Sequence, residues 1–156
     1  MRSVARDDRA QLTATKDAKS RIRLTIELAD VRLTRIEGLT SAKQFEQASE
    51  SLGHYLGLIE DAMRFIGGLA RDKNSTRDLY RKVDIALRGH IPRLAVMRRE
   101  TPSDYALHFK AAEEFARNSR TDALESFYGK TVLREVANPA TKADANKTTS
   151  PDNKRP

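Results

Sequence analysis

The chain has no cysteine and no tryptophan, and aromatic residues make up only 6% of it. The lack of cysteine excludes disulfides and thiolate metal sites, but it does not fix the cellular compartment, because exported proteins can lack cysteine too. The apolar runs are far shorter than the roughly 20 residues that a membrane span needs. A phosphate-binding glycine loop, a nucleophile elbow and a dinucleotide fingerprint are also missing, so the sequence has no motif of a known enzyme class.

What the sequence does contain is charge and helical periodicity. Its 156 residues fit one domain, with a charged share of 33% against an apolar share of 38%. This balance suits an elongated helical bundle, whose surface is large for its volume. We therefore predict an all-α fold, namely an antiparallel up-down-up-down four-helix bundle with a kinked third helix and a disordered C-terminal tail.

The most regular stretch is 45–69, which we expect to be the central rod of the bundle. Its apolar residues recur at alternating gaps of about three and four, the spacing of a helix that packs along another helix. They are Phe45, Ala48, Leu52, Tyr55, Ile59, Ala62, Ile66 and Leu69. Gly53 and Gly57 share a second face, which predicts that a neighbouring backbone or large side chain approaches closely there.

The first expected helix, 15–37, is apolar on two sides and should end at Gly38. One stripe, which includes Ile22, Ala29 and Leu33, suits the core. A second, nearly opposite stripe consists of Leu24, Leu28 and Val31. That stripe meets either the C-terminal helix of the same chain or another subunit, so these three residues are candidates for an oligomer interface.

Two further helices follow, the third from Ser75 and the fourth after Pro102. Pro92 lies inside the third helix and predicts the kink, because proline removes one backbone donor. The fourth helix should reach about Tyr128, either as one rod or with a break near Asn118. The connections are short, so consecutive helices should be antiparallel neighbours.

The ends of the chain are expected to lie outside the helical domain. Residues 1–14 are polar and weakly periodic, and we interpret them as a loose N-terminal arm or a fraying helix. The helical domain then spans 15–137. The segment 138–156 is polar, contains proline and has no apolar anchor, which predicts disorder.

Positive charge gathers on the third expected helix. The net charge of the whole chain is +7, and residues 71–100 hold nine Lys or Arg against four acids. Arg77, Arg81, Arg88 and Arg99 line up opposite the apolar face. Such a row can bind phosphates or acidic proteins, but it is also what an ordinary solvated helix face looks like, partly neutralised by Asp84 and Glu100.

Residues suited to catalysis are scattered. His54, His90 and His108 each stand alone, and none has the Glu-x-x-His spacing of a dimetal bundle. We expect His90, on an apolar face, to bond an oxygen at the edge of the core. The acidic pairs Glu60-Asp61 and Glu113-Glu114 should be solvated. We therefore predict no catalytic, cofactor-binding or metal-binding residues and no cofactor.

Three blocks resemble a set of uncharacterised bacterial helical-bundle proteins: AKSRIRLTIELADVRL, NSTRDLYRKVDIALRGHIPRL and SDYALHFKAAEEFARNSRTDALESFYG. The resemblance covers roughly 17–129 and implies a bundle and, in many such proteins, export. It brings no activity or site residues. The acidic metal-binding motifs of phosphate-signalling bundles have no counterpart in this chain.

The function expected from the sequence is therefore a non-enzymatic one. The first hypothesis is a structural or interaction protein that works through protein contacts, as a homo-oligomer or with another protein. The alternative is binding of a polyanion, either nucleic acid or an anionic surface, through the arginine row. As written, the chain has no signal peptide and no membrane span and should be cytoplasmic. It should be exported if the true start lies upstream.

Overall fold

A computed structural model describes residues 1–137 of the chain, with side chains up to Tyr128. This part is all α-helix and contains no strand, which confirms the predicted fold class. The expected number of helices was four, and the described residues form five. They are α1 (Arg6–Ala14), α2 (Ala18–Ser41), α3 (Phe45–Gly67), α4 (Asn74–Glu100) and α5 (Ser103–Ala137). The predicted disorder of 138–156 falls outside the described residues.

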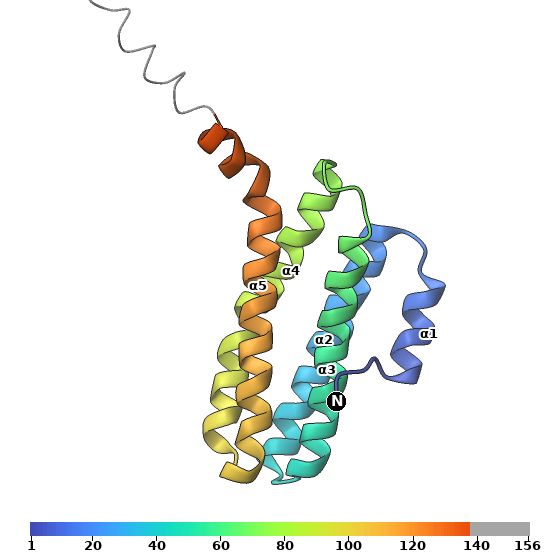
Figure 1. Cartoon of the computed structure of the whole chain (residues 1–156). Coiled ribbons are helices and arrows are strands. Elements are labelled where there is room, and N and C mark those ends of the chain that lie inside the picture. The colour runs from blue at the N-terminus through green and yellow to red at the C-terminus, as the bar shows by residue number, and fades with distance from the viewer. Residues whose placement is uncertain (138–156) are drawn as a thin grey trace, which may run out of the picture.

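The four long helices run side by side, and consecutive ones point in opposite directions (Figure 1). α2 packs along α3 and α4 packs along α5, and the two pairs are joined by α3 on α5 and α2 on α4. α3 and α4 share much less contact, although a short connection links them. The expectation that all consecutive helices are close neighbours is therefore wrong for α3 and α4. The connection between them, residues 68–73, is long enough to place α4 diagonally across the bundle from α3.

The predicted apolar stripes form the core. Ile22, Ala29, Leu33 and Ile36 of α2 are fully buried, and so are six of the eight seam positions of α3, namely Ala48, Leu52, Tyr55, Ile59, Ala62 and Ile66. Leu87 and Leu94 of α4 and Phe109 of α5 complete the centre. Helical periodicity therefore identified the buried faces of α2 and α3 correctly.

The N-terminal segment is not the loose arm that we expected. Residues 1–4 lie along α3, and the Ser3 N–H donates to the Gly53 carbonyl at 3.2 Å. A Cβ at Gly53 would lie 2.5 Å from the Met1 carbonyl oxygen, and one at Gly57 would overlap the Ser3 carbonyl group. The prediction that a backbone approaches this glycine pair is confirmed, and the backbone belongs to the chain's own N-terminus.

α1 then packs on the outside of α2 (Figure 1). Leu12 is its only large apolar residue inside the core, with 1% exposed. Asp8 of α1 pairs with Arg32 of α2 at 2.9 Å, and Arg2 pairs with Glu60 of α3 at 3.0 Å. A helix with one apolar anchor and several ion pairs leaves almost no periodic signal in the sequence, which is why the sequence predicts at most a fraying helix here.

Gly38 does not end α2, which continues to Ser41. Instead, Lys43 takes a left-handed conformation with φ of 60°. The N–H groups of Lys43 and Gln44 then donate to the carbonyls of Thr40 and Leu39, at 3.0 and 2.9 Å. These two bonds form a Schellman-type end, which usually has glycine at the left-handed position.

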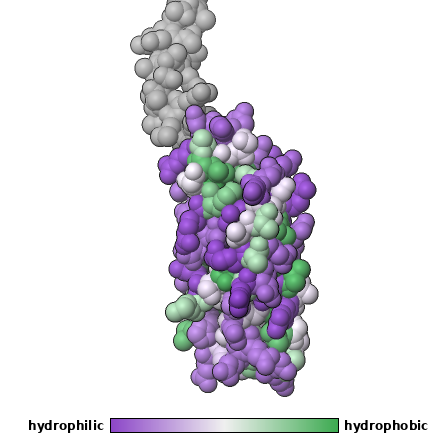
Figure 2. All heavy atoms as spheres, turned by 90° about the vertical axis from the view of Figure 1, so that its right-hand side faces the viewer, coloured by the Kyte–Doolittle hydropathy of each residue, from purple (hydrophilic) through white to green (hydrophobic). Residues whose placement is uncertain are grey.

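α4 and α5 are each continuous in the described chain. α4 runs through Pro92, which lies on its exposed side, and the kink that we expected there stays a prediction. α5 has no break near Asn118 and continues past Tyr128 to Ala137. No helix of the described residues is both long enough and apolar enough to cross a membrane. The face that carries α1 is mostly hydrophilic, with small separate apolar spots (Figure 2).

Four buried carboxylates are each paired with arginine from a neighbouring helix. Besides Asp8, they are Asp61 with Arg21 at 3.2 Å, Asp84 with Arg120 at 2.7 Å, and Glu113 with Arg98 at 3.2 Å. Solvation was expected for both acidic pairs, but Asp61 and Glu113 are 8% and 7% exposed. Removing one partner would leave the other charge buried alone, which is strongly destabilising.

The glycine contact leads to a paired stability prediction. Gly57→Ala should destabilise the protein by about 1–3 kcal/mol, because the added methyl group overlaps the Ser3 backbone. Gly38→Ala is the matched control, because a Cβ there meets nothing within 4 Å. It should raise stability by about 0.5–1 kcal/mol through helix propensity. Urea unfolding measures both, and equal shifts for the two variants would contradict the described position of the N-terminus.

Candidate interaction surface and cleft along α4

The four arginines of the predicted row have different surroundings. Arg77 is half-buried, and its Nε donates to the Phe127 carbonyl of α5 at 3.1 Å. Arg88 pairs with Asp84, one turn earlier, at 3.1 Å. Arg81 and Arg99 are exposed and form no ion pair within residues 1–128. The structure thus does not present the row as four equivalent cations.

Arg81, Ile85 and Arg88 form the exposed edge of α4, which we call the α4 ridge. Ile85 is 54% exposed between the two arginines. On the α5 side, a cavity of about 320 Å³ separates the ridge from Tyr128, which is 52% exposed. Apolar and basic groups therefore alternate on this surface. Arg99 lies eighteen residues beyond Arg81, which is about 27 Å along an α-helix, and is not part of the ridge.

The helix is held in this orientation by its opposite face. Leu79, Val83 and Leu87 are buried in the core. Asp84 is 3% exposed and accepts hydrogen bonds from Arg120 of α5 and from Arg88. These contacts determine the rotation of α4 about its axis. Because Ile85 follows Asp84 directly, they also place its side chain outside the core.

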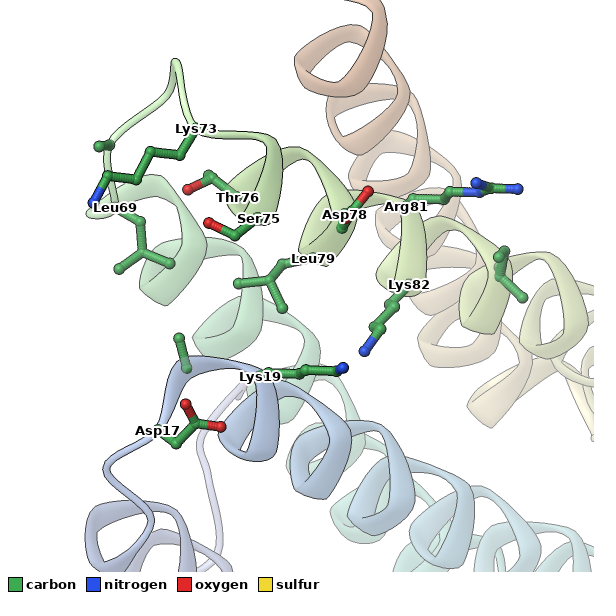
Figure 3. Close-up of a pocket in the computed structure, with 13 residues that line it drawn as sticks. Asp17, Lys19, Leu69, Lys73, Ser75, Thr76, Asp78, Leu79, Arg81 and Lys82 are labelled. Carbon is green, nitrogen blue, oxygen red and sulfur yellow. The ribbon is translucent and has the colours of Figure 1, made fainter.

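On its other side, α4 forms a cleft with the start of α2 and the connection between α3 and α4. This α2–α4 cleft has a volume of about 820 Å³ (Figure 3). Leu79 and Leu69 provide apolar lining, and Ile85 and Arg81 are shared with the ridge. Clefts of roughly 300–1,000 Å³ are typical of small-molecule sites.

The charge of the cleft is positive. Four basic residues line it, Lys19, Lys73, Arg81 and Lys82, against the two acids Asp17 and Asp78. The Asp17 carboxylate caps α2, accepting bonds from the Ser20 N–H at 3.0 Å and the Ser20 hydroxyl at 2.8 Å. These hydrogen bonds, together with the positive charges of Lys19 and Arg23, lower the pKa of Asp17, so its carboxylate stays ionised and offsets part of the basic charge.

A polar chain crosses the bundle near its middle. The buried Tyr55 hydroxyl lies 2.9 Å from His90 Nδ1, and His90 Nε2 lies 2.8 Å from Asp30 on the surface of α2. Arg93 pairs with Asp30 and Glu37, which adds a second link between α4 and α2. Burial lowers the pKa of His90, and the hydrogen bond to Asp30 opposes that effect. The prediction that His90 bonds an oxygen at the edge of the core is confirmed.

The second stripe of α2 is only partly accessible. Leu24 and Leu28 are half-buried against the core, while Val31 is 68% exposed. We had expected the C-terminal helix as the covering element within the chain. The helices that pack on α2 are α1, α3 and α4. The role of this stripe as an oligomer interface stays a prediction.

Sequence reasoning missed several residues of this surface. Ile85 and Tyr128 resemble ordinary apolar positions in the sequence, and Lys19 lies more than 50 residues before Lys73 and Lys82 in the chain. No local pattern could have brought the three lysines together. The described residues hold no group of three or more His, Cys, Asp or Glu side chains able to bind a metal ion.

The chain matches no protein-family model, no curated protein and no solved structure with which it was compared. The resemblance to bacterial helical bundles therefore gains no support from these comparisons. Any function has to be argued from the chain's own surface.

The His90 contacts predict a pH dependence of stability. The pKa of His90 is lowered from 6.5 in the folded state, so the unfolded chain takes up a proton first as the pH falls. Stability should be complete above about pH 6.5 and fall below it by at most about 1.4 kcal/mol per pH unit, until the folded pKa is reached. Urea unfolding between about pH 7.5 and pH 5 measures the slope.

Two variants isolate this effect. His90→Gln should be less stable near neutral pH, since the Tyr55 hydroxyl loses its ring partner, but should have a flatter pH profile. His108→Gln is the control, because His108 is exposed, and it should keep the wild-type slope. An unchanged slope in His90→Gln would contradict the assignment.

Proposed function

We propose that this chain is a non-enzymatic interaction protein and that the α4 ridge binds an acidic protein partner. The observation that carries the proposal is the exposure of Ile85 between Arg81 and Arg88, with Tyr128 facing it across a shallow cavity. Exposed apolar side chains within a charged rim are the usual composition of a protein–protein contact.

The same observation favours protein over nucleic acid as the partner. A surface that neutralises phosphates needs several accessible cations and gains little from aliphatic groups. Of the predicted row, Arg77 and Arg88 already have partners within the chain, which leaves Arg81 as the ridge's unpaired arginine in the described part. Polyanion binding through this face is therefore the weaker alternative.

The proposal can be tested with a photo-reactive residue placed at Ile85 in the native cell. A discrete cross-link to one protein should form there, and the cross-linked peptide should be rich in Asp and Glu. Leu107 of α5 is a matched control position, because it is also apolar and is 69% exposed. Equal adducts at both positions, no adduct at 85, or a cross-link to nucleic acid would overturn the proposal.

Charge reversal then tests the basic part of the ridge. With the partner so identified, Arg81→Glu should weaken its affinity about tenfold, which equals about 1.4 kcal/mol. Arg99→Glu is the control, because Arg99 is an exposed arginine on the same helix beyond the ridge, and its affinity should be that of the wild type. Calorimetric titration measures both, and equal losses would show only a general charge effect.

Self-association through α2 is the second candidate, favoured by the 68% exposure of Val31. It requires a stable dimer in solution, whereas the α4 ridge requires no second copy. For a dimer held by this stripe, light scattering at two salt concentrations should give twice the chain mass at both, and Val31→Glu should return the monomer. A wild-type monomer at high protein concentration would remove this candidate.

A further inference from the structure

Two lysines of the α2–α4 cleft converge from different helices. Lys19 of α2 and Lys82 of α4 point toward one another across the cleft, and Leu79 lies to one side of the pair (Figure 3). Neither forms an ion pair within residues 1–128. Like charges that face each other repel, and a bound anion would remove that repulsion.

The two acids of the cleft do not fill this role. Asp17 is held by Ser20, and the Asp78 side chain points away from the lysine pair in Figure 3. The space beside the lysines is lined instead by apolar groups. Leu79 is 4% exposed, Leu69 is half-buried, and Ile85 stands at the edge.

A second polar feature faces the same space. Thr76 is 3% exposed and lines the cleft. It lies in the first turn of α4, where Lys73 at the N-cap supplies no side-chain bond to the free backbone N–H groups. The basic pair and this uncapped turn both favour a negatively charged or strongly polar ligand.

We propose that the α2–α4 cleft binds a small amphiphile with one anionic head and an aliphatic body, such as a medium-chain carboxylate. The head lies between Lys19 and Lys82, and the body covers Leu69 and Leu79. The volume of about 820 Å³ suits one such molecule and not a folded partner segment. This site adjoins the α4 ridge and shares Arg81 and Ile85 with it, but the two lysines that hold the head belong to the cleft alone.

Calorimetric titration of the full chain tests the proposal with three probes. Decanoate carries both parts of the ligand, decanol has the same body without charge, and propionate has the head with a short body. Decanoate should bind with one site per chain, and the other two should bind at least about tenfold more weakly. Equal binding of decanoate and decanol would overturn the proposal, because it would show only unspecific apolar adsorption.

Variants connect binding to the lysine pair. Lys19→Ala and Lys82→Ala should each weaken decanoate binding about five- to tenfold, while Lys110→Ala, an exposed lysine of α5, should leave it unchanged. NMR shifts of the Leu69 and Leu79 amides on decanoate addition should confirm the place. Affinity for anionic lipid vesicles without affinity for free decanoate would overturn the proposal, since the ligand would then be a membrane surface.

If decanoate does not bind, the proposed binding of a protein partner is unaffected. If no partner binds the α4 ridge, the proposed amphiphile site is likewise unaffected. The cross-link at Ile85 and the Arg81→Glu result concern the protein partner, whereas Lys19 and Lys82 are altered only here. An unchanged cross-link in Lys19→Ala would show that the two sites act independently.

Discussion

The burial of α3 is the constraint on which the rest of the structure depends. From Ser51 to Ala62 only His54 and Glu60 escape burial, so this helix needs neighbours on every side. α2 and α5 cover two of its sides, and the core seam faces the interior of the bundle. The remaining side carries Gly53 and Gly57, and residues 1–4 of the chain cover it. The N-terminal residues are thus ordered because, without them, this side of α3 would be exposed to solvent.

Several arginines of this basic chain form ion pairs with buried carboxylates and are therefore not free to bind a partner. Asp8, Asp61, Asp84 and Glu113 are buried, and each occupies at least one arginine of a neighbouring helix. This pairing reduces the number of arginines that are free to meet a partner, but it leaves the net charge of +7 unchanged. Arg81 on the ridge and Lys19 and Lys82 in the cleft form no ion pair within residues 1–128, which is why both proposals concern α4 and its neighbours.

The polar chain through His90 links those surfaces to the core. Asp30 and Glu37 of α2 bind His90 and Arg93 of α4, so the spacing of these two helices is set by polar contacts as well as by packing. α2 and α4 are also the two walls of the cleft. The buried Tyr55 hydroxyl anchors the network in α3. A buried polar network whose hydrogen bonds are all formed fixes the positions of its side chains more strictly than apolar packing alone.

The sequence by itself determined the helices and their buried faces, because periodicity depends only on spacing along one helix. The seam of α3, the core role of His90 and the close approach at Gly53 and Gly57 were all predictable in this way. Tertiary structure decided the contacts between helices, which the spacing of residues along one helix does not predict. It ordered α1 around Leu12 and an ion pair and turned Asp61 and Glu113 inward. It also gave Arg77 and Arg88 partners within the chain but none to Arg81, and it brought Lys19 close to Lys82. Each of these depends on a partner from a distant part of the chain, and such partners meet only once the helices have packed.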